Sequence, residues 1–193
     1  MVHLYQVRRD AIIEAAASVL RESGPNALTH RAVAAEAGVP LAATTYYFAS
    51  KEELLVEGLA AAAGAEVARL TQLADALDQA IAAGDDPAAT IAQLLAGGLA
   101  AEYASVATKF EVYLAAYRRP SLRPACEGWI RAFRALAERA MARAGAADPE
   151  RAGSLLVGAV DGLLMRRLAL GEEELDAASF AGEIEPLVRA LAA

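Results

Sequence analysis

Residues 29–51 read THRAVAAEAGVPLAATTYYFASK, and the fold predicted for the chain depends on this stretch. Thr29 is a favoured N-cap residue, and Val33 with the alanines around it keeps helical spacing. Gly38 stands where a helix ends in a left-handed residue, because a residue without a Cβ enters that conformation at little cost. Pro40 suits the first turn of a second helix, where its missing N–H is not needed. The stretch therefore predicts two short helices joined by a tight glycine turn.

Another helix, the fourth of the chain, is expected to begin where the stretch ends. Ser50-Lys51-Glu52-Glu53 is a capping box, in which the Ser50 oxygen and the Glu53 carboxylate satisfy free amides at the helix start. Two helices joined by a short turn that contains glycine form a helix-turn-helix, whose second helix enters the major groove of DNA. We therefore expect residues 40–47 to be a DNA-recognition helix.

Residues 9–55 resemble the DNA-binding domain of TetR-family transcriptional regulators, and they cover about a quarter of the chain. Besides the apolar face of the first helix, the matching residues are Gly24, Thr29, Arg31, Val33 to Ala37, Gly38-Val39, Phe48 and Ser50 to Leu55. The resemblance implies a homodimeric, ligand-responsive repressor without enzymatic activity. Such a repressor binds a palindromic operator in double-stranded DNA and is released by a small-molecule effector.

The whole chain is predicted to be all-α, since β-branched runs are absent and alanine and leucine dominate. Besides the two short helices, we expect helices over residues 5–23, 50–83, 87 to about 100, 105–118, 123–144, 149–170 and 177–191, about nine in all. The expected organisation is a three-helix DNA-binding domain in residues 1–53, which the long fourth helix joins to a regulatory and dimerisation domain in residues 54–193.

Composition limits the other classes of function. With 56% apolar residues the chain can bury a core, yet its longest uncharged run has 15 residues, fewer than the roughly 20 that a membrane span needs. No signal peptide opens the sequence, so a soluble cytoplasmic protein is expected. One cysteine and two scattered histidines give no metal-ligand spacing, and we expect no metal and no cofactor. Cys126 is either a buried small hydrophobe or a redox-sensitive thiol.

The net charge of −7 argues against a protein that coats nucleic acid without selection. The charge is unevenly divided: residues 1–53 carry five Arg or Lys against six Asp or Glu, and residues 54–193 carry 13 against 19. A nearly neutral DNA-binding domain can work if a few well-placed cations meet phosphates and a dimer doubles them.

The recognition helix carries an unusually apolar set of candidate DNA contacts. They are Leu41, Ala42, Ala43, Thr45, Tyr46 and Tyr47. No Arg, Asn or Gln is present for a bidentate base contact, so specificity is expected to rest partly on thymine methyl groups and DNA shape. In the family the position aligned with Thr45 is usually tyrosine. Tyr46 is either a contact or part of the core.

Further candidate contacts lie at two helix starts. Thr29 and His30 stand where free amides and the helix dipole favour a phosphate, although Thr29 can be a cap and nothing more. Arg31 can reach a base or the backbone, and Lys51 matches the family's usual phosphate contact. For both cations the alternative is an idle surface charge.

The resemblance implies an effector pocket in the C-terminal domain. Most of the chain's aromatic residues fall in one span, namely Tyr103, Phe110, Tyr113, Tyr117, Trp129 and Phe133. Such a cluster fits a pocket for a flat or apolar molecule with tyrosine hydroxyls to orient it, and it fits an ordinary core equally well.

The last two helices carry apolar stripes at helical spacing. By resemblance they pair with their copies in a homodimer, through Leu156, Val160, Leu164, Phe180, Ile184, Leu187, Val188 and Leu191. The alternative is that these stripes face the core of their own subunit. Two functional alternatives also stay open: a helical protein-interaction module that has the fold but no operator, and a small enzyme, for which no nucleophile and base pattern is found.

Overall fold

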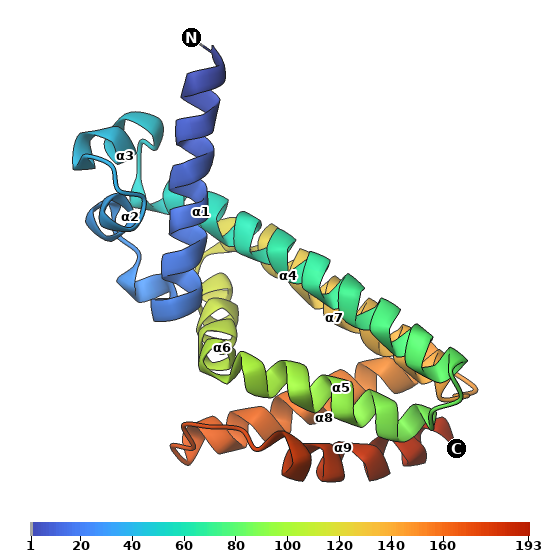
Figure 1. Ribbon diagram of the computed structural model, residues 1–193. Coiled ribbons are helices and arrows are strands. Elements are labelled where there is room, and N and C mark those ends of the chain that lie inside the picture. The colour runs from blue at the N-terminus through green and yellow to red at the C-terminus, as the bar shows by residue number, and fades with distance from the viewer. Residues whose placement is uncertain (1) are drawn as a thin grey trace. The chain divides into compact units, whose positions relative to one another are not determined.

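The computed structural model describes residues 2–193, and for residues 2–4 and Ala104 it describes the backbone alone. The described chain is helical throughout and has no strand, as predicted (Figure 1). Its elements are α1 (Val2–Ala27), α2 (His30–Glu36), α3 (Leu41–Tyr47), α4 (Lys51–Ala82), α5 (Pro87–Ala101), α6 (Tyr103–Arg118), the 3-10 helix η1 (Pro120–Leu122), α7 (Arg123–Arg143), α8 (Pro149–Ala169) and α9 (Ala177–Ala192). None of these helices is long and apolar enough to cross a membrane.

The helix bounds differ from the predicted ones by a few residues, most visibly in α1. We expected this helix to end at Ser23, and the structure carries it to Ala27 across a kink. Gly24 has a φ of 75° and ends the regular helix, and the segment from Pro25 onward forms one more turn. Proline is tolerated there because the first turn of a helix does not use its N–H.

The chain divides into two compact units. The first unit comprises the chain up to Glu66 together with Thr108–Trp129, and the second comprises Val67–Ala107 and Ile130–Ala193. This division does not follow the predicted boundary between residues 53 and 54. The chain of α4 contributes to both units, and most of α6 belongs with the N-terminal helices.

One apolar core holds the first unit together. From the N-terminal helices it takes large side chains that are fully or almost fully buried, namely Ile12, Leu20, Leu28, Val33, Phe48, Leu54, Leu55 and Leu59. From α6, η1 and α7 it takes Val112, Ala116, Leu122 and Cys126. Because these four are buried in the same cluster, α6 cannot be separated from the DNA-binding helices without exposing apolar surface.

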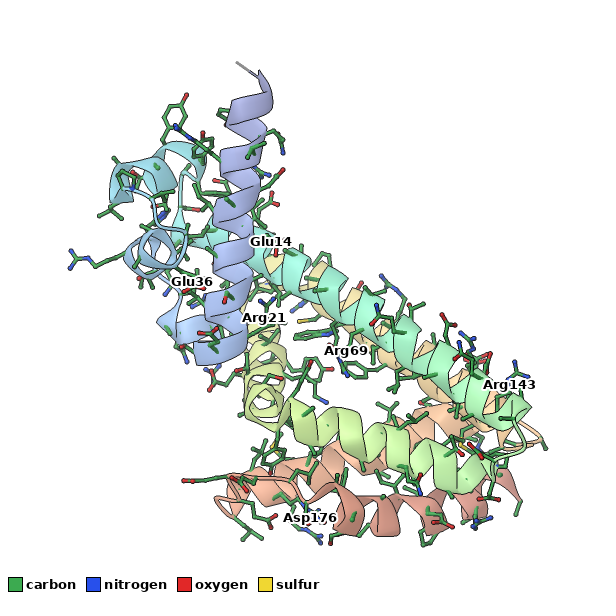
Figure 2. The ribbon with its side chains drawn as sticks, viewed as in Figure 1. Glu14, Arg21, Glu36, Arg69, Arg143 and Asp176 are labelled. Atoms are coloured by element: carbon green, nitrogen blue, oxygen red, sulfur yellow. The ribbon has the colours of Figure 1, made fainter. Side chains whose placement is uncertain are left out.

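The second unit is built from the remaining helices. In this unit α9 packs against both α5 and α8 (Figure 1). Asp78 near the end of α4 accepts hydrogen bonds from Arg143 Nε at 2.8 Å and Arg139 Nε at 3.2 Å. Figure 2 shows Arg143 at the end of α7, close to the end of α4. The hydrogen bonds from Arg143 and then Arg139 lower the pKa of Asp78 to about 2.

Candidate functional site

The turn between α2 and α3 has the geometry that its sequence predicts. Gly38 has a φ of 65°, in the left-handed region. Its N–H donates to the carbonyl of Ala35 at 3.2 Å, and the N–H of Val39 donates to the carbonyl of Ala34 at 3.0 Å. This pair of bonds is a Schellman motif, which satisfies carbonyls that the helix end leaves free. Val39 also packs against the core of the first unit. The turn hydrogen bonds and this apolar contact together fix the angle between α2 and α3.

Thr44 anchors α3 from its inner side. Its side chain is fully buried, and its hydroxyl donates to the carbonyl of Leu41 at 2.9 Å. The same hydroxyl lies 3.4 Å from the carbonyl of His30 in α2. Pro40 is the N-cap of α3 and not its first helical residue, a shift of one position from the prediction. Turning α3 about its axis would move this buried side chain out of its place and break its contact with the His30 carbonyl, so Thr44 helps to fix which side of α3 faces inward.

The predicted caps of α2 and α4 are both formed. Thr29 Oγ1 accepts a hydrogen bond from the N–H of Ala32 at 3.1 Å. At the start of α4, Ser50 Oγ accepts from the N–H of Glu53 at 3.1 Å, and the Glu53 carboxylate accepts from the N–H of Ala49 at 2.8 Å. These bonds hold the two helix starts that carry the predicted phosphate contacts.

Four of the six candidate contacts on α3 lie on its exposed side. Tyr46 is 74% exposed and Leu41 is 44% exposed, so Tyr46 is not a core residue. Ala42 and Thr45 are exposed as well, whereas Ala43 and Tyr47 are half-buried. The Thr45 hydroxyl donates a hydrogen bond to the carbonyl of Ala42 at 3.2 Å. Its proton is therefore used within α3.

The candidate contacts outside α3 are mostly at the surface. Thr29, Arg31 and Lys51 are exposed, and His30 is half-buried. The Nδ1 atom of His30 is buried and has no hydrogen-bond partner among the described residues. Arg31 and Lys51 therefore present cations at the starts of α2 and α4.

The six aromatic residues predicted as a pocket do not share one environment. Tyr103 and Phe133 belong to the second unit, and the other four belong to the first. The rings of Phe110 and Tyr113 meet edge to face with centroids 6.3 Å apart, and Trp129 packs against the core of the first unit. Tyr117 is 81% exposed.

Two other features of the second unit bear on a ligand. The hydroxyl of the buried Tyr103 has no hydrogen-bond partner among the described residues, and burial raises the pKa of this tyrosine. An open polar hollow at the start of α8 contains none of the predicted aromatic residues. It is lined by Arg134, Asp148, Glu150, Arg151, Ser154 and Leu155.

The residues predicted for the dimer interface need correction. Six of them are buried within the single chain, namely Leu156, Val160, Leu164, Phe180, Ile184 and Val188. Only Leu187 and Leu191 are half-buried. Because α9 packs on α5 and α8, the apolar stripes are used inside the subunit, as the alternative reading of the sequence proposed.

A different face of α8 is left uncovered in the single chain. It carries Leu155, Gly158, Gly162 and Met165, which we call the α8 seam. Leu155 is 52% exposed and Met165 is 44% exposed, and a Cβ added to either glycine would meet nothing within 4 Å. The spacing of these four residues, alternately three and four, is that of a helix seam that packs against another helix. The same spacing can be seen in the sequence, beside the stronger apolar stripe.

Residues 12–58 match the family described as bacterial regulatory proteins, tetR family, and residues 82–193 match the tetracyclin repressor-like C-terminal domain. No curated protein matches the chain.

Several solved structures are similar over nearly the whole chain. The multidrug binding protein EbrR, in its complex with proflavin, is 34% identical, with a TM-score of 0.64 over 93% of this chain and 99% of that chain. A member of the TetR family from Streptomyces coelicolor is 33% identical, with a TM-score of 0.58 over 93% and 97%. A transcriptional regulator from Rhodococcus shares the fold at 20% identity, with a TM-score of 0.71 over 95% of each chain.

Family members are DNA-binding regulators and not enzymes, with a helix-turn-helix domain like the one formed here by α2 and α3. The match of residues 82–193 and the EbrR identity over most of the chain together establish the relationship. This chain belongs to the TetR family of bacterial transcriptional regulators.

Proposed function

We propose that this regulator is a homodimeric repressor that binds a palindromic operator through α3 and leaves it when a small molecule binds. The observation that carries the DNA-binding part is the outer side of α3. Its residues are exposed, while Thr44 and the Schellman turn at Gly38 fix the inner side. A helix held in this way can enter a major groove as a rigid body.

The proposed contacts divide into positioning and reading contacts. Arg31 and Lys51 meet phosphates, which sets the register of the protein on the duplex. Leu41 and Ala42 contact thymine methyl groups, and the tyrosine hydroxyls of α3 form hydrogen bonds with phosphates of the DNA backbone. Since α3 has no side chain that reads a base with two hydrogen bonds, DNA shape supplies part of the specificity.

The proposed dimer forms through the α8 seam. Leu155 and Met165 supply apolar area, and Gly158 and Gly162 let a second helix approach closely. A two-fold axis there presents two copies of α3 to half-sites about one helical turn, roughly 34–36 Å, apart.

The proposed effector is a flat aromatic molecule. The multidrug binding protein EbrR, 32–34% identical to this chain, has solved structures in complex with proflavin, ethidium and malachite green. Of the aromatic residues predicted for a pocket, Tyr103 and Phe133 lie in the second unit and have rings of the kind that stack on such a molecule. Effector binding changes the tilt of α4, whose chain runs from the DNA-binding helices into the second unit, and thereby the distance between the two copies of α3. The effector acts only to the extent that it binds the released state more tightly.

A gel-shift experiment tests the proposal. DNA from around the protein's own coding region should give a band that survives an excess of unrelated DNA. Ala42→Glu should abolish the band, because it places a carboxylate on the exposed side of α3 next to phosphates. Ala68→Glu is the matched control. Ala68 is exposed in α4, and its substitution adds the same charge away from α3.

Three outcomes decide between the functions. Loss of the band on addition of proflavin or ethidium would support a releasing effector. A specific band that no tested dye affects would refute the proposed effector class and leave DNA binding intact. No specific band with any tested duplex, together with capture of another protein, would favour the interaction module.

A further inference from the structure

Three tyrosine rings meet beside the recognition helix. Tyr46 and Tyr47 belong to α3, and Tyr5 lies near the start of α1, before the residues that match the family's DNA-binding domain. The ring centroids of Tyr5 and Tyr47 are 4.7 Å apart, those of Tyr46 and Tyr47 are 5.2 Å apart, and those of Tyr5 and Tyr46 are 6.3 Å apart. Aromatic pairs attract over this range of distances, so each ring contacts the other two.

The three rings differ in how they are held. Tyr47 is half-buried and packs against the core of the first unit. Tyr5 is 42% exposed and tilted at 54° to the ring of Tyr47. Tyr46 is the outermost, and it meets Tyr5 at 73° and Tyr47 at 87°, both edge-to-face geometries. Tyr5 and Tyr47 thus form a seat for the ring of Tyr46.

The outer position of Tyr46 matters because α3 has few polar groups to offer DNA. Thr44 is buried, and the proton of Thr45 is donated to the helix backbone. A phenolic hydroxyl both donates and accepts, so the hydroxyl of Tyr46 can bond a phosphate or a base edge. A side chain that is already oriented loses less conformational entropy when it binds.

We propose that Tyr5 is a positioning residue for DNA recognition, which orients the side chain of Tyr46 toward the duplex through ring contacts. This inference rests on the proposed operator binding and adds the first turns of α1 to the elements that determine it. The ring of Tyr5 performs this role and its hydroxyl does not. Replacement by phenylalanine therefore preserves the role and replacement by alanine removes it.

The test uses the full-length protein and a duplex that the wild type selects from a random-sequence pool. Tyr5→Ala should weaken binding about three- to tenfold per subunit, the size of an aromatic pair contact. Tyr5→Phe should bind within about twofold of the wild type. Val7→Ala is the matched control, because Val7 is exposed in the same part of α1 and the change also shortens a side chain to alanine. It should leave the affinity unchanged.

A double-mutant cycle separates positioning from a general effect on the fold. In a Tyr46→Ala background, Tyr5→Ala should cause little further loss, since the side chain on which it acts is gone. Tyr5→Ala also loses the contact with Tyr47 and should unfold at a lower temperature than Val7→Ala, so binding is measured at a temperature at which all variants are fully folded. An equal loss in both backgrounds would show that Tyr5 acts on the fold, and would overturn the inference.

The remaining outcomes are also decisive. A loss in Tyr5→Phe as large as that in Tyr5→Ala would overturn the positioning role, because it would show that the hydroxyl itself contacts DNA. Unchanged binding by Tyr5→Ala would refute the inference and leave operator binding in place. If the wild type selects no sequence from the pool, the proposed function fails and this inference fails with it.

Discussion

Replacing Gly38 by alanine isolates the energetic cost of the turn between α2 and α3. The φ of Gly38 is 65°, and a Cβ added there would meet nothing within 4 Å. The cost is therefore conformational and not steric. A residue with a Cβ loses about 1–2 kcal/mol in the left-handed region. Alanine also restricts the unfolded chain, which recovers about 0.4–1 kcal/mol. We expect Gly38→Ala to lower the free energy of unfolding by about 1 kcal/mol, the difference of these two effects.

Gly64 provides the matched control. It lies within α4, its φ is not positive, and an added Cβ would likewise meet nothing within 4 Å. Gly64→Ala should therefore stabilise the protein by about 0.5–1 kcal/mol through helix propensity. The same substitution is thus expected to have opposite signs at the two positions. Gly38→Asn should cost less than Gly38→Ala, because asparagine enters the left-handed region more readily.

Urea denaturation measures this difference. All variants are compared at one protein concentration, since the stability of a dimer depends on concentration. With a slope of about 2 kcal/mol per molar urea, the midpoints of the two alanine variants should differ by nearly 1 M. If Gly38→Ala is as stable as Gly64→Ala, the argument from backbone conformation is wrong.

Three further predictions concern DNA, the two faces of α8, and pH. Arg31→Ala should weaken operator binding and make the slope of log K against log salt concentration shallower by about one per subunit. A titration of the binding constant with salt measures this slope. An unchanged slope would exclude a phosphate contact by Arg31. Leu156→Ala should lower the free energy of unfolding by about 2–5 kcal/mol, because it opens a cavity in the core. Leu155→Glu should leave the subunit folded and give monomers in analytical ultracentrifugation. A stable dimer of that variant would refute the α8 seam as the dimer interface. Hydrogen bonds from Arg143 and then Arg139 lower the pKa of Asp78 to about 2, so their contribution to stability is present above pH 3.8 and is lost as the pH falls toward 2. The stability difference between the wild type and Asp78→Asn should shrink over that interval in acid denaturation, and a constant difference would contradict it.

The local structure of the DNA-binding helices could be predicted because each signal acts over a few residues. Thr29, Gly38 and Ser50 are a cap, a left-handed turn and a capping serine, and each depends on bonds to neighbours in the sequence. The exposure of Tyr46 could not be decided in the same way. An aromatic residue on a short helix suits either a core or a surface, and the answer depends on which side of α3 faces the core, which is the side that carries the buried Thr44.

The roles of the apolar faces could not be read from periodicity. A stripe at helical spacing shows that a helix face is covered, and it does not show whether the same chain or a second copy covers it. Leu156 and Phe180 are covered within the subunit, while Leu155 and Met165 are not. The division into compact units differs from the predicted boundary between residues 53 and 54 for a related reason. The side chains of α6 that enter the first core, such as Val112, have no sequence feature that names their partner.

The place of α6 in the first unit changes where coupling between effector and DNA can act. The Thr108 hydroxyl lies 3.4 Å from the carbonyl of Arg21 at the end of α1, and beyond the other end of α6 the Ser121 hydroxyl contacts Glu52 at the start of α4. A hydrogen bond of this kind, partly buried at Thr108 and exposed at Ser121, contributes only about 0.5–1.5 kcal/mol net, so these two bonds do not hold α6 in place by themselves. Apolar burial does, because Val112 and Ala116 share one core with α1 and α4. A displacement of α6 must therefore carry both helices with it or expose that core. The tilt of α4 proposed for release thus requires a matching movement of α6.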